Sequence, residues 1–246
     1  MRGRYLVLLP LLAWGVLHNS VEAQLGGLVN KAKNAVLGKG GDLSADEAGS
    51  GLKEALNVGI DQAVSFLSAK DGYYASPYKI LMPEEAKAMA AKLKIIPGFA
   101  KFEEDLLEKM NRAAEDAATQ AKPIFVNAIK QMTFKDAMNI LMGQKNAATQ
   151  YLQTTTTSPL TEAFLPVIQT SLDKFKAREY WASAVTAYNK IPLVKKMNPE
   201  LDKYVTEKAL LGMFQLVEKK ELEIRENVDS RSSDLLKKVF AKQDKK

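Results

Sequence analysis

Residues 101–122 read KFEEDLLEKMNRAAEDAATQAK, and this stretch decides the fold that the sequence predicts. Its apolar residues recur every three or four positions, which is the spacing of one face of an amphipathic helix. These residues are Phe102, Leu106, Met110, Ala113, Ala117 and Ala121. Five of the residues between 113 and 121 are alanines, so the side chains on this part of the helix are small. We therefore expect another helix to pack unusually close against it.

The same helical spacing continues on both sides of this stretch. Helices are expected over residues 44–69, 83–96, 124–132, 134–142, 146–154, 160–175, 178–189, 199–226 and 234–240. Pro123 is expected to restart or kink the helix before it, and the four threonines of 154–157, which precede Ser158 and Pro159, are expected to form a tight loop. No segment of four to eight residues alternates as a strand does. The sequence therefore predicts an all-α, single-domain bundle of about eight to ten helices.

Two details place individual residues in this bundle. Residues 209–214 (ALLGMF) are apolar on every side, so we expect them at its centre, with Gly212 marking a close crossing. Thr133 is expected to cap the short helix that follows it, with Asp136 at the third helical position and Gly143 closing the helix.

The N-terminus has the pattern of a signal peptide. Arg2 and Arg4 precede an apolar run over residues 5–17, and small or short side chains, Val21 and Ala23, stand where a signal peptidase reads them. The run is too short for the ~20 apolar residues of a membrane-spanning helix, and Pro10 breaks it. We expect cleavage between Ala23 and Gln24 and a periplasmic or secreted product, with no transmembrane segment after cleavage.

Three parts of the chain follow from this. Residues 1–23 are the signal peptide, 24–42 a basic leading segment with a Gly-rich linker, and 43–246 the helical domain with a short Lys-rich tail. Residues 24–37 have a weak helical periodicity. The sequence leaves open whether this segment touches a membrane surface, docks on its own domain or frays in solution.

Composition excludes several kinds of chemistry. The chain has no Cys, and its single histidine, His18, lies in the predicted signal peptide. The mature protein therefore has no Ser-His-Asp triad, no Cys-His pair and no conventional zinc site. No Asp-rich calcium loop and no phosphate-binding glycine loop is present, so no metal or cofactor is predicted. The net charge of +6 does not indicate nucleic-acid binding, because the basic residues are interleaved with acidic ones.

Two groups of polar residues stand out as candidates. Asn111, Glu115 and Lys122 are expected on one stripe of the 101–122 helix, because offsets of four and eleven return to nearly the same angle. Such a stripe could bind a polar ligand, and a desolvated Glu115 could act as a base. The more ordinary interpretation is a set of interhelical hydrogen bonds and ion pairs. The second group, near the end of the 199–226 helix, consists of Glu221, Glu223, Arg225 and Arg231. Its two arginines could bind a phosphate or carboxylate, but structural pairing is again the more ordinary interpretation.

Several blocks of sequence, in order, resemble a known bacterial family. They are LSADEA at 43–48, GLKEAL at 51–56, MNRAAEDAA at 110–118, AKPIF at 121–125, MTFKDA at 132–137, IL at 140–141, AATQY at 147–151, YVTEKAL at 204–210, IREN at 224–227 and RSSDLLKKVF at 231–240. Together they resemble the exported family catalogued as domain of unknown function 4197, from Leu43 to Phe240. The resemblance implies a helical, exported, single-domain protein of Gram-negative bacteria with no assigned activity.

The resemblance carries over no catalytic residue, because the family has none established. If a ligand site exists, the polar positions inside the matching blocks are where we expect it. These positions are Asn111, Arg112, Glu115, Lys122, Asp136, Thr149, Gln150, Tyr151 and Arg225. The same residues could equally form a buried polar network that fixes the register of the helices.

Three hypotheses about function remain. The first is a non-enzymatic periplasmic protein that binds a small molecule, a lipid or an envelope protein. The second is a carboxylate-based hydrolase of an envelope polymer, with Glu115 as its central residue. The third is a purely structural envelope factor.

Overall fold

The computed structural model describes residues 44–93, 101–174, 176–190, 192–198 and 200–241. Contacts divide the chain into two units, residues 1–45 and 46–246, and the description below concerns the second. The predictions about the signal peptide and the leading segment fall outside the described residues.

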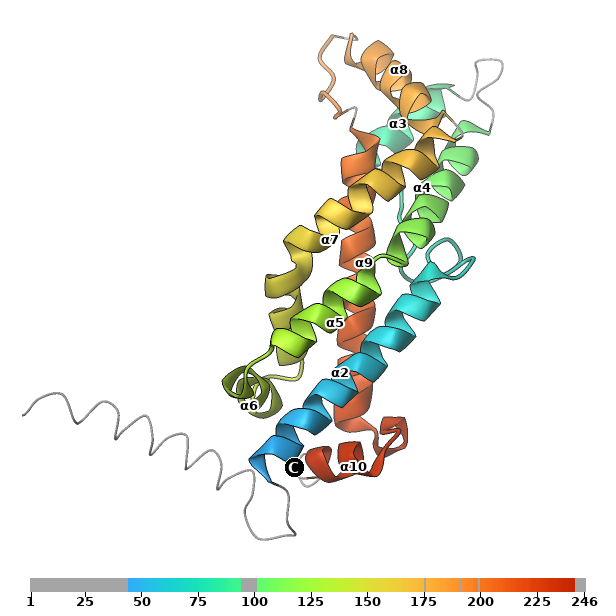
Figure 1. The fold of residues 1–246 in the computed structure, drawn as a ribbon. Coiled ribbons are helices and arrows are strands. Elements are labelled where there is room, and N and C mark those ends of the chain that lie inside the picture. Colours follow the sequence, from blue (N-terminus) through green and yellow to red (C-terminus); the bar gives the residue numbers. More distant parts are fainter. Residues whose placement is uncertain (1–43, 94–100, 175, 191, 199, 242–246) are drawn as a thin grey trace, which may run out of the picture. The chain divides into compact units, whose positions relative to one another are not determined.

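The described part of the chain contains nine α-helices, one short 3₁₀-helix and no strand (Figure 1). They are α2 (Ala45–Ser68), α3 (Glu84–Leu93), α4 (Phe102–Ala118), α5 (Ala121–Gln131), α6 (Phe134–Met142), α7 (Ala147–Asp173), α8 (Ala177–Asn189), α9 (Leu201–Glu226), η1 (Val228–Ser230) and α10 (Asp234–Phe240). The all-α prediction is confirmed, and so is the expected range of helix numbers.

The core forms where α7 packs against α4 and α9. Ala113, Ala114, Ala117 and Ala118 of α4 are fully buried, and α4 makes one of the most extensive helix contacts of the molecule with α7. The close approach predicted from the alanines is therefore present. The ring of Phe125 on α5 packs edge-on against that of Phe214 on α9, with centroids 6.0 Å apart, so α5 covers the same core.

The central stretch of α9 lies in the core as predicted, with one exception. Residues 209, 210, 212, 213 and 214 are buried, whereas Leu211 is 48% exposed. A Cβ on Gly212 would lie 3.1 Å from the ring of Tyr73 and 3.3 Å from Cβ of Tyr78. The close approach at Gly212 is thus with the connector after α2, rather than a helix crossing.

The loop predicted at the four threonines is wrong, because α7 runs through them without a break. Each threonine hydroxyl donates a hydrogen bond to the backbone carbonyl four residues earlier. The first runs from Thr154 to Gln150 O at 2.9 Å, and the last from Thr157 to Gln153 O at 2.6 Å. α7 also places a residue in the core at every fourth position here, so that one side of the helix forms a continuous buried stripe. That stripe consists of Leu152, Thr156, Leu160, Phe164, Ile168 and Leu172.

The helix predicted over 101–122 is two helices. α4 ends at Ala118 and α5 begins at Ala121, so the break lies before Pro123 rather than at it. Pro123 has no N–H to donate to the carbonyl of Thr119, and its ring crowds that carbonyl. The helix is therefore interrupted one turn upstream of the proline. This break moves Lys122 off the stripe of Asn111 and Glu115.

Candidate functional site

Asn111 holds the connector between α2 and α3 in place. Its side chain is fully buried on α4. Its Oδ1 accepts from the N–H of Ile80 at 2.8 Å, and its Nδ2 donates to the carbonyls of Ile80 and Leu107 at 2.9 and 2.8 Å. The amide has therefore satisfied both backbone groups of Ile80, which is what a structural residue in a polar network does.

Glu115, one turn further along α4, binds the start of the same connector. Its Oε1 accepts from the backbone N–H groups of Tyr73 and Tyr74 at 3.1 and 3.0 Å, and its Oε2 accepts from Nη1 of Arg112 at 2.8 Å. The residue is only 5% exposed. Both oxygens are thus engaged inside the protein, and the carboxylate is not placed to act on a substrate.

Arg112 completes this first cluster. Its Nη2 donates to Oδ1 of Asp71 at 2.8 Å, so one guanidinium joins α4 to the turn that ends α2. Hydrogen bonding to Glu115, above all, raises the pKa of Arg112. Asp71 has φ 70°, and a Cβ on Gly72 would lie 2.2 Å from the carbonyl of Phe66. The cluster therefore fixes a turn that only glycine fits at position 72.

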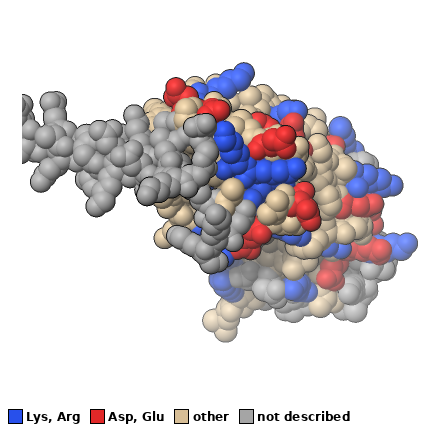
Figure 2. Space-filling view, turned by 90° about the horizontal axis from the view of Figure 1, so that it is seen from below, with Lys and Arg blue, Asp and Glu red and all other residues tan. Residues whose placement is uncertain are grey.

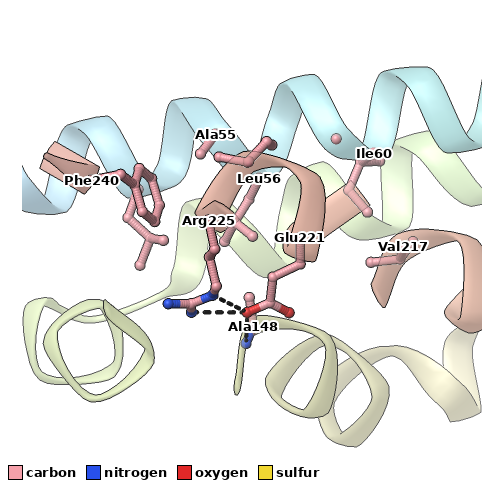
Figure 3. Close-up of a pocket in the computed structure, with 11 residues that line it drawn as sticks. Ala55, Leu56, Ile60, Ala148, Val217, Glu221, Arg225 and Phe240 are labelled. Atoms are coloured by element: carbon pink, nitrogen blue, oxygen red, sulfur yellow. Dashed lines mark hydrogen bonds and ion pairs between the residues drawn. The ribbon is translucent and has the colours of Figure 1, made fainter. Parts of the chain in front are cut away.

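A second buried cluster is centred on Glu221 of α9 (Figure 3). Its oxygens accept from the N–H of Ala148 at 3.0 Å and from the N–H and hydroxyl of Thr149, both at 2.8 Å. These donors belong to the first turn of α7, where helix N–H groups have no partner within the helix and the helix dipole favours negative charge. Glu221 therefore caps α7 from a distance of 72 residues in sequence.

Arg225 is the counter-charge of Glu221. Its Nε donates to Glu221 Oε1 at 2.9 Å, and its Nη2 donates to the carbonyl of Ile140 on α6, also at 2.9 Å. Arg231 donates to the carbonyls of Ile224 and Arg225 at 2.9 and 3.0 Å and so satisfies the end of α9. Structural pairing, one of the two interpretations of Arg225 and Arg231, accounts for these contacts.

The space beside this cluster is small. It lies between α2, α9 and α10 and is lined by apolar residues such as Leu56, Ile60 and Phe240 together with Glu221 and Arg225 (Figure 3). Its volume of about 20 Å³ is enough for roughly one water molecule. The second cluster therefore has no room for a ligand.

The remaining predicted residues lie apart from both clusters. Lys122 pairs with Asp61 of α2 at 2.6 Å. Asp136 caps α6: its Oδ2 accepts from the N–H of Thr133 at 3.0 Å, and Thr133 Oγ1 accepts from the N–H of Asp136 at 3.1 Å, as the sequence predicts. Gln150 is exposed and donates to Asn146. Tyr151 lines a shallow groove between α5 and α7. The nine predicted positions thus do not form one site.

A hollow of about 400 Å³ lies elsewhere, beside α8 and the start of α9. Figure 1 shows these two segments at one end of the bundle. We call this space the Trp181 hollow. It is lined by Pro83, Trp181 of α8, residues 195–198 and 200, and Leu201, Lys203, Tyr204 and Glu207 of α9. Its volume is within the range of pockets that hold small molecules, roughly 300–1,000 Å³.

Trp181 has an unusual hydrogen-bonding state. The residue is 2% exposed, and its Nε1 is the one buried side-chain nitrogen or oxygen in the described ranges that has no hydrogen-bond partner. A buried N–H without an acceptor costs about 1–3 kcal/mol, so native proteins rarely keep one. This donor, beside a hollow of ligand size, distinguishes the Trp181 hollow from the two clusters.

Asn189, the last residue of α8, holds Met197, which lines the hollow. Its Nδ2 donates to the carbonyl of Met197 at 2.9 Å, and its Oδ1 accepts from the N–H of Met197 at 2.8 Å. Lys196 donates to the carbonyl of Asn189. The hydroxyl of Tyr204 donates to the carbonyl of Leu81 at 2.8 Å. These contacts give the hollow a shape that does not depend on a bound molecule.

Sequence reasoning missed the Trp181 hollow, because none of its residues lies among the nine predicted positions. One signal was present: Trp181 is the only tryptophan after Trp14. A single Trp in a helix gives no sign that its N–H lacks a partner. That fact arises from the packing of α8 on α9, which local sequence does not encode.

Charge and metal-binding groups point to no further site. On the face shown in Figure 2, Lys and Arg are interspersed with Asp and Glu, as the sequence suggests. Within the described residues, no three His, Cys, Asp or Glu side chains are grouped so that they could hold a metal ion. None of the helices described here is long and apolar enough to cross a membrane.

Comparison with known proteins yields one match. The family model described as "Protein of unknown function (DUF4197)" matches residues 42–241. No curated protein and no solved structure matches the chain. Since the match covers all but the two ends of the sequence, the chain belongs to the DUF4197 family of proteins of unknown function, the family that its ordered sequence blocks resemble.

Proposed function

We propose that this protein is an exported, non-enzymatic binding protein of the bacterial periplasm, which holds a small ligand in the Trp181 hollow. The observation that carries the proposal is the buried N–H of Trp181, which lacks an acceptor beside a hollow of about 400 Å³. An acceptor atom of a ligand would remove the cost of that unpartnered donor. The ligand is thus expected to stabilise the fold.

The geometry does not favour the hydrolase alternative. Glu115, its central residue, uses one oxygen for two backbone N–H groups and the other for Arg112. A general base must instead reach the proton that it abstracts from a substrate or a water. Export is supported by the pattern of the first 23 residues, with Arg2 and Arg4 before an apolar run and Ala23 before the expected cleavage.

Native mass spectrometry of the protein purified gently from an envelope fraction tests both parts of the proposal. The expected result is a polypeptide that begins at Gln24 and carries a reproducible extra mass. The W181F variant, purified alongside, should lose the adduct, because it keeps an aromatic ring but has no N–H. K135Q, which changes an exposed lysine on α6, is the control and should keep it.

The outcomes separate the hypotheses. A clean apo mass from repeated preparations, together with no shift in melting temperature on adding envelope extract, contradicts the binding proposal and favours the structural envelope factor. A chain that retains residues 1–23 contradicts cleavage and leaves the binding result to be judged separately.

A further inference from the structure

We infer that the ligand of the Trp181 hollow is an amphipathic anion, a carboxylate or phosphate attached to an apolar body. This inference depends on the proposed function, since it names the class of molecule that the hollow binds. The argument begins with Trp181, whose indole N–H is a donor only. Its partner in the hollow must therefore be an acceptor atom, and an oxygen that bears negative charge is the strongest.

Three acceptors in or beside the wall of the hollow are already engaged. The carbonyl of Met197 accepts from Asn189, Oδ1 of Asn198 accepts from the N–H of Glu200 at 2.9 Å, and the carbonyl of Leu81 accepts from Tyr204. A ligand that brings donors would find these oxygens in use. Trp181, by contrast, brings to the lining of the hollow a donor that has no partner.

The charged residues of the hollow also favour a ligand with negatively charged acceptor oxygens. Three lysines and two glutamates line it. Lys203 pairs with Glu200 at 2.6 Å, and Lys196 donates to a backbone carbonyl, but each ammonium carries three N–H groups. Both lysines can therefore donate to a ligand oxygen while they keep these contacts. The excess of one positive charge also favours an anion.

The body of the ligand is indicated by the apolar part of the lining. Met197 and Leu201 are buried, and the aromatic side chains of Trp181 and Tyr204 line the same space with Pro83. The side chain of Leu81, whose carbonyl Tyr204 holds, is 57% exposed. Acetate or inorganic phosphate alone would leave this surface uncovered, whereas a hydrocarbon chain would bury it.

Isothermal titration calorimetry with decanoate and decyl phosphate, below the concentrations at which they form micelles, tests the inference. Both should bind with one molecule per chain. 1-Decanol and decyltrimethylammonium, which keep the chain but not the negative charge, should bind about tenfold more weakly or not at all, since a hydrogen bond to a charged group is lost. Acetate and inorganic phosphate test the head group alone and should show no binding.

Substitutions locate the site. W181F should weaken decanoate binding about tenfold, and K196Q or K203Q should weaken it by a smaller factor. K135Q is the matched control with the same change of charge and should bind decanoate like the wild type. The melting temperature and circular dichroism of W181F show whether it folds.

A direct measurement covers the case in which W181F does not fold. In a full-length W14F chain labelled with ¹⁵N-tryptophan, Trp181 gives the only indole N–H resonance. Saturation with decanoate should shift this resonance downfield, as expected when an N–H gains an anionic acceptor. 1-Decanol should leave it in place.

Two results would overturn the inference. One is equal binding of decanol, decyltrimethylammonium and decanoate; the other is an indole resonance that does not move at saturating decanoate. A neutral or cationic adduct in the envelope preparation would also overturn it, while the proposed function would stand. If no probe binds and the protein from the envelope has a clean apo mass, both the inference and the proposed function are contradicted.

Discussion

Replacing Glu221 by glutamine should destabilise the protein by about 3–5 kcal/mol. The carboxylate is buried and accepts from four donors: the N–H of Ala148, the N–H and hydroxyl of Thr149, and Nε of Arg225. Whichever way the amide turns, its NH₂ replaces an oxygen that now faces donors, and Arg225 is left buried without a counter-charge. Breaking a buried pair in this way costs about 3–5 kcal/mol.

This loss is a large part of the total, since native domains are stable by about 5–15 kcal/mol. For a domain of this size each kcal/mol lowers the melting temperature by about 2–4 °C, so a fall of roughly 6–20 °C is expected. Urea unfolding followed by circular dichroism at the helix band gives the free energy directly. The matched control is E226Q, which removes an exposed carboxylate paired with Lys145 and should cost less than about 1 kcal/mol.

The double variant E221L/R225L tests the reason for the loss. Because it removes both charges, it should be more stable than E221L alone, in which Arg225 has no partner. The reasoning is refuted if E221Q unfolds within 1 kcal/mol of the wild type at an unchanged slope in urea. It is also refuted if the double variant is less stable than E221L.

Three further substitutions test other parts of the structure. G212L should cost about 1–3 kcal/mol, because even a Cβ there would lie 3.1 Å from Tyr73, and an unchanged melting temperature would contradict the packing of the connector on α9. N111A should cost at least about 2 kcal/mol and speed hydrogen exchange at the amide of Ile80, which loses its acceptor; a protected Ile80 amide would argue against this role. D136N should cost about 0.5–2 kcal/mol at pH 7 and progressively less as the pH falls below about 4. Hydrogen bonds from Thr133 lower the pKa of Asp136, so its contribution is present above its unfolded pKa and is lost as the pH falls through the folded one; a gap between D136N and wild type that stays constant down to pH 2 would contradict this.

Local signals predicted most of the helices. The cap at Thr133 and Asp136 and the helix from Asp234 to Phe240 were predicted to the residue, because side chains within four positions determine them. The centre of α9 was predicted from its composition alone. The exposed Leu211 shows the limit of that signal, since an all-apolar segment does not indicate which side meets solvent.

The errors in the fold have a common cause. Threonine runs and prolines usually mark loops. A threonine hydroxyl, however, can also donate to a backbone carbonyl of its own helix, and a proline disturbs the carbonyl of the residue four positions before it. At 154–157 the buried stripe of α7 outweighed the low helix propensity of threonine. At Pro123 the break fell near Thr119, which separated Lys122 from Asn111.

The candidate site was less predictable than the fold. Asn111 and Glu115 were placed together because they are neighbours on one helix, whereas the contact of Arg112 with Glu115 was not predicted. Their partners, such as the N–H of Tyr73, lie about 40 residues away, and no spacing rule reveals them. Thr149 and Arg225 meet only through Glu221. The N–H of Trp181 is free because no acceptor lies near it. Only the packed structure shows this, since it depends on residues far away in the sequence.

The contacts of α2 and of the connector that follows it also bear on when the protein can fold. The hydroxyl of Tyr73 donates to the carbonyl of Ala209 at 2.7 Å, 136 residues later, and Gly51 lies against Val239 near the end of the chain. As the ribosome releases the chain from its N-terminus, these two contacts cannot form until α9 and α10 have been made. Such long-range closure is slow. The packing of α2 and its connector is therefore completed late, after the helices that lie between them and α9 in the sequence have been synthesised.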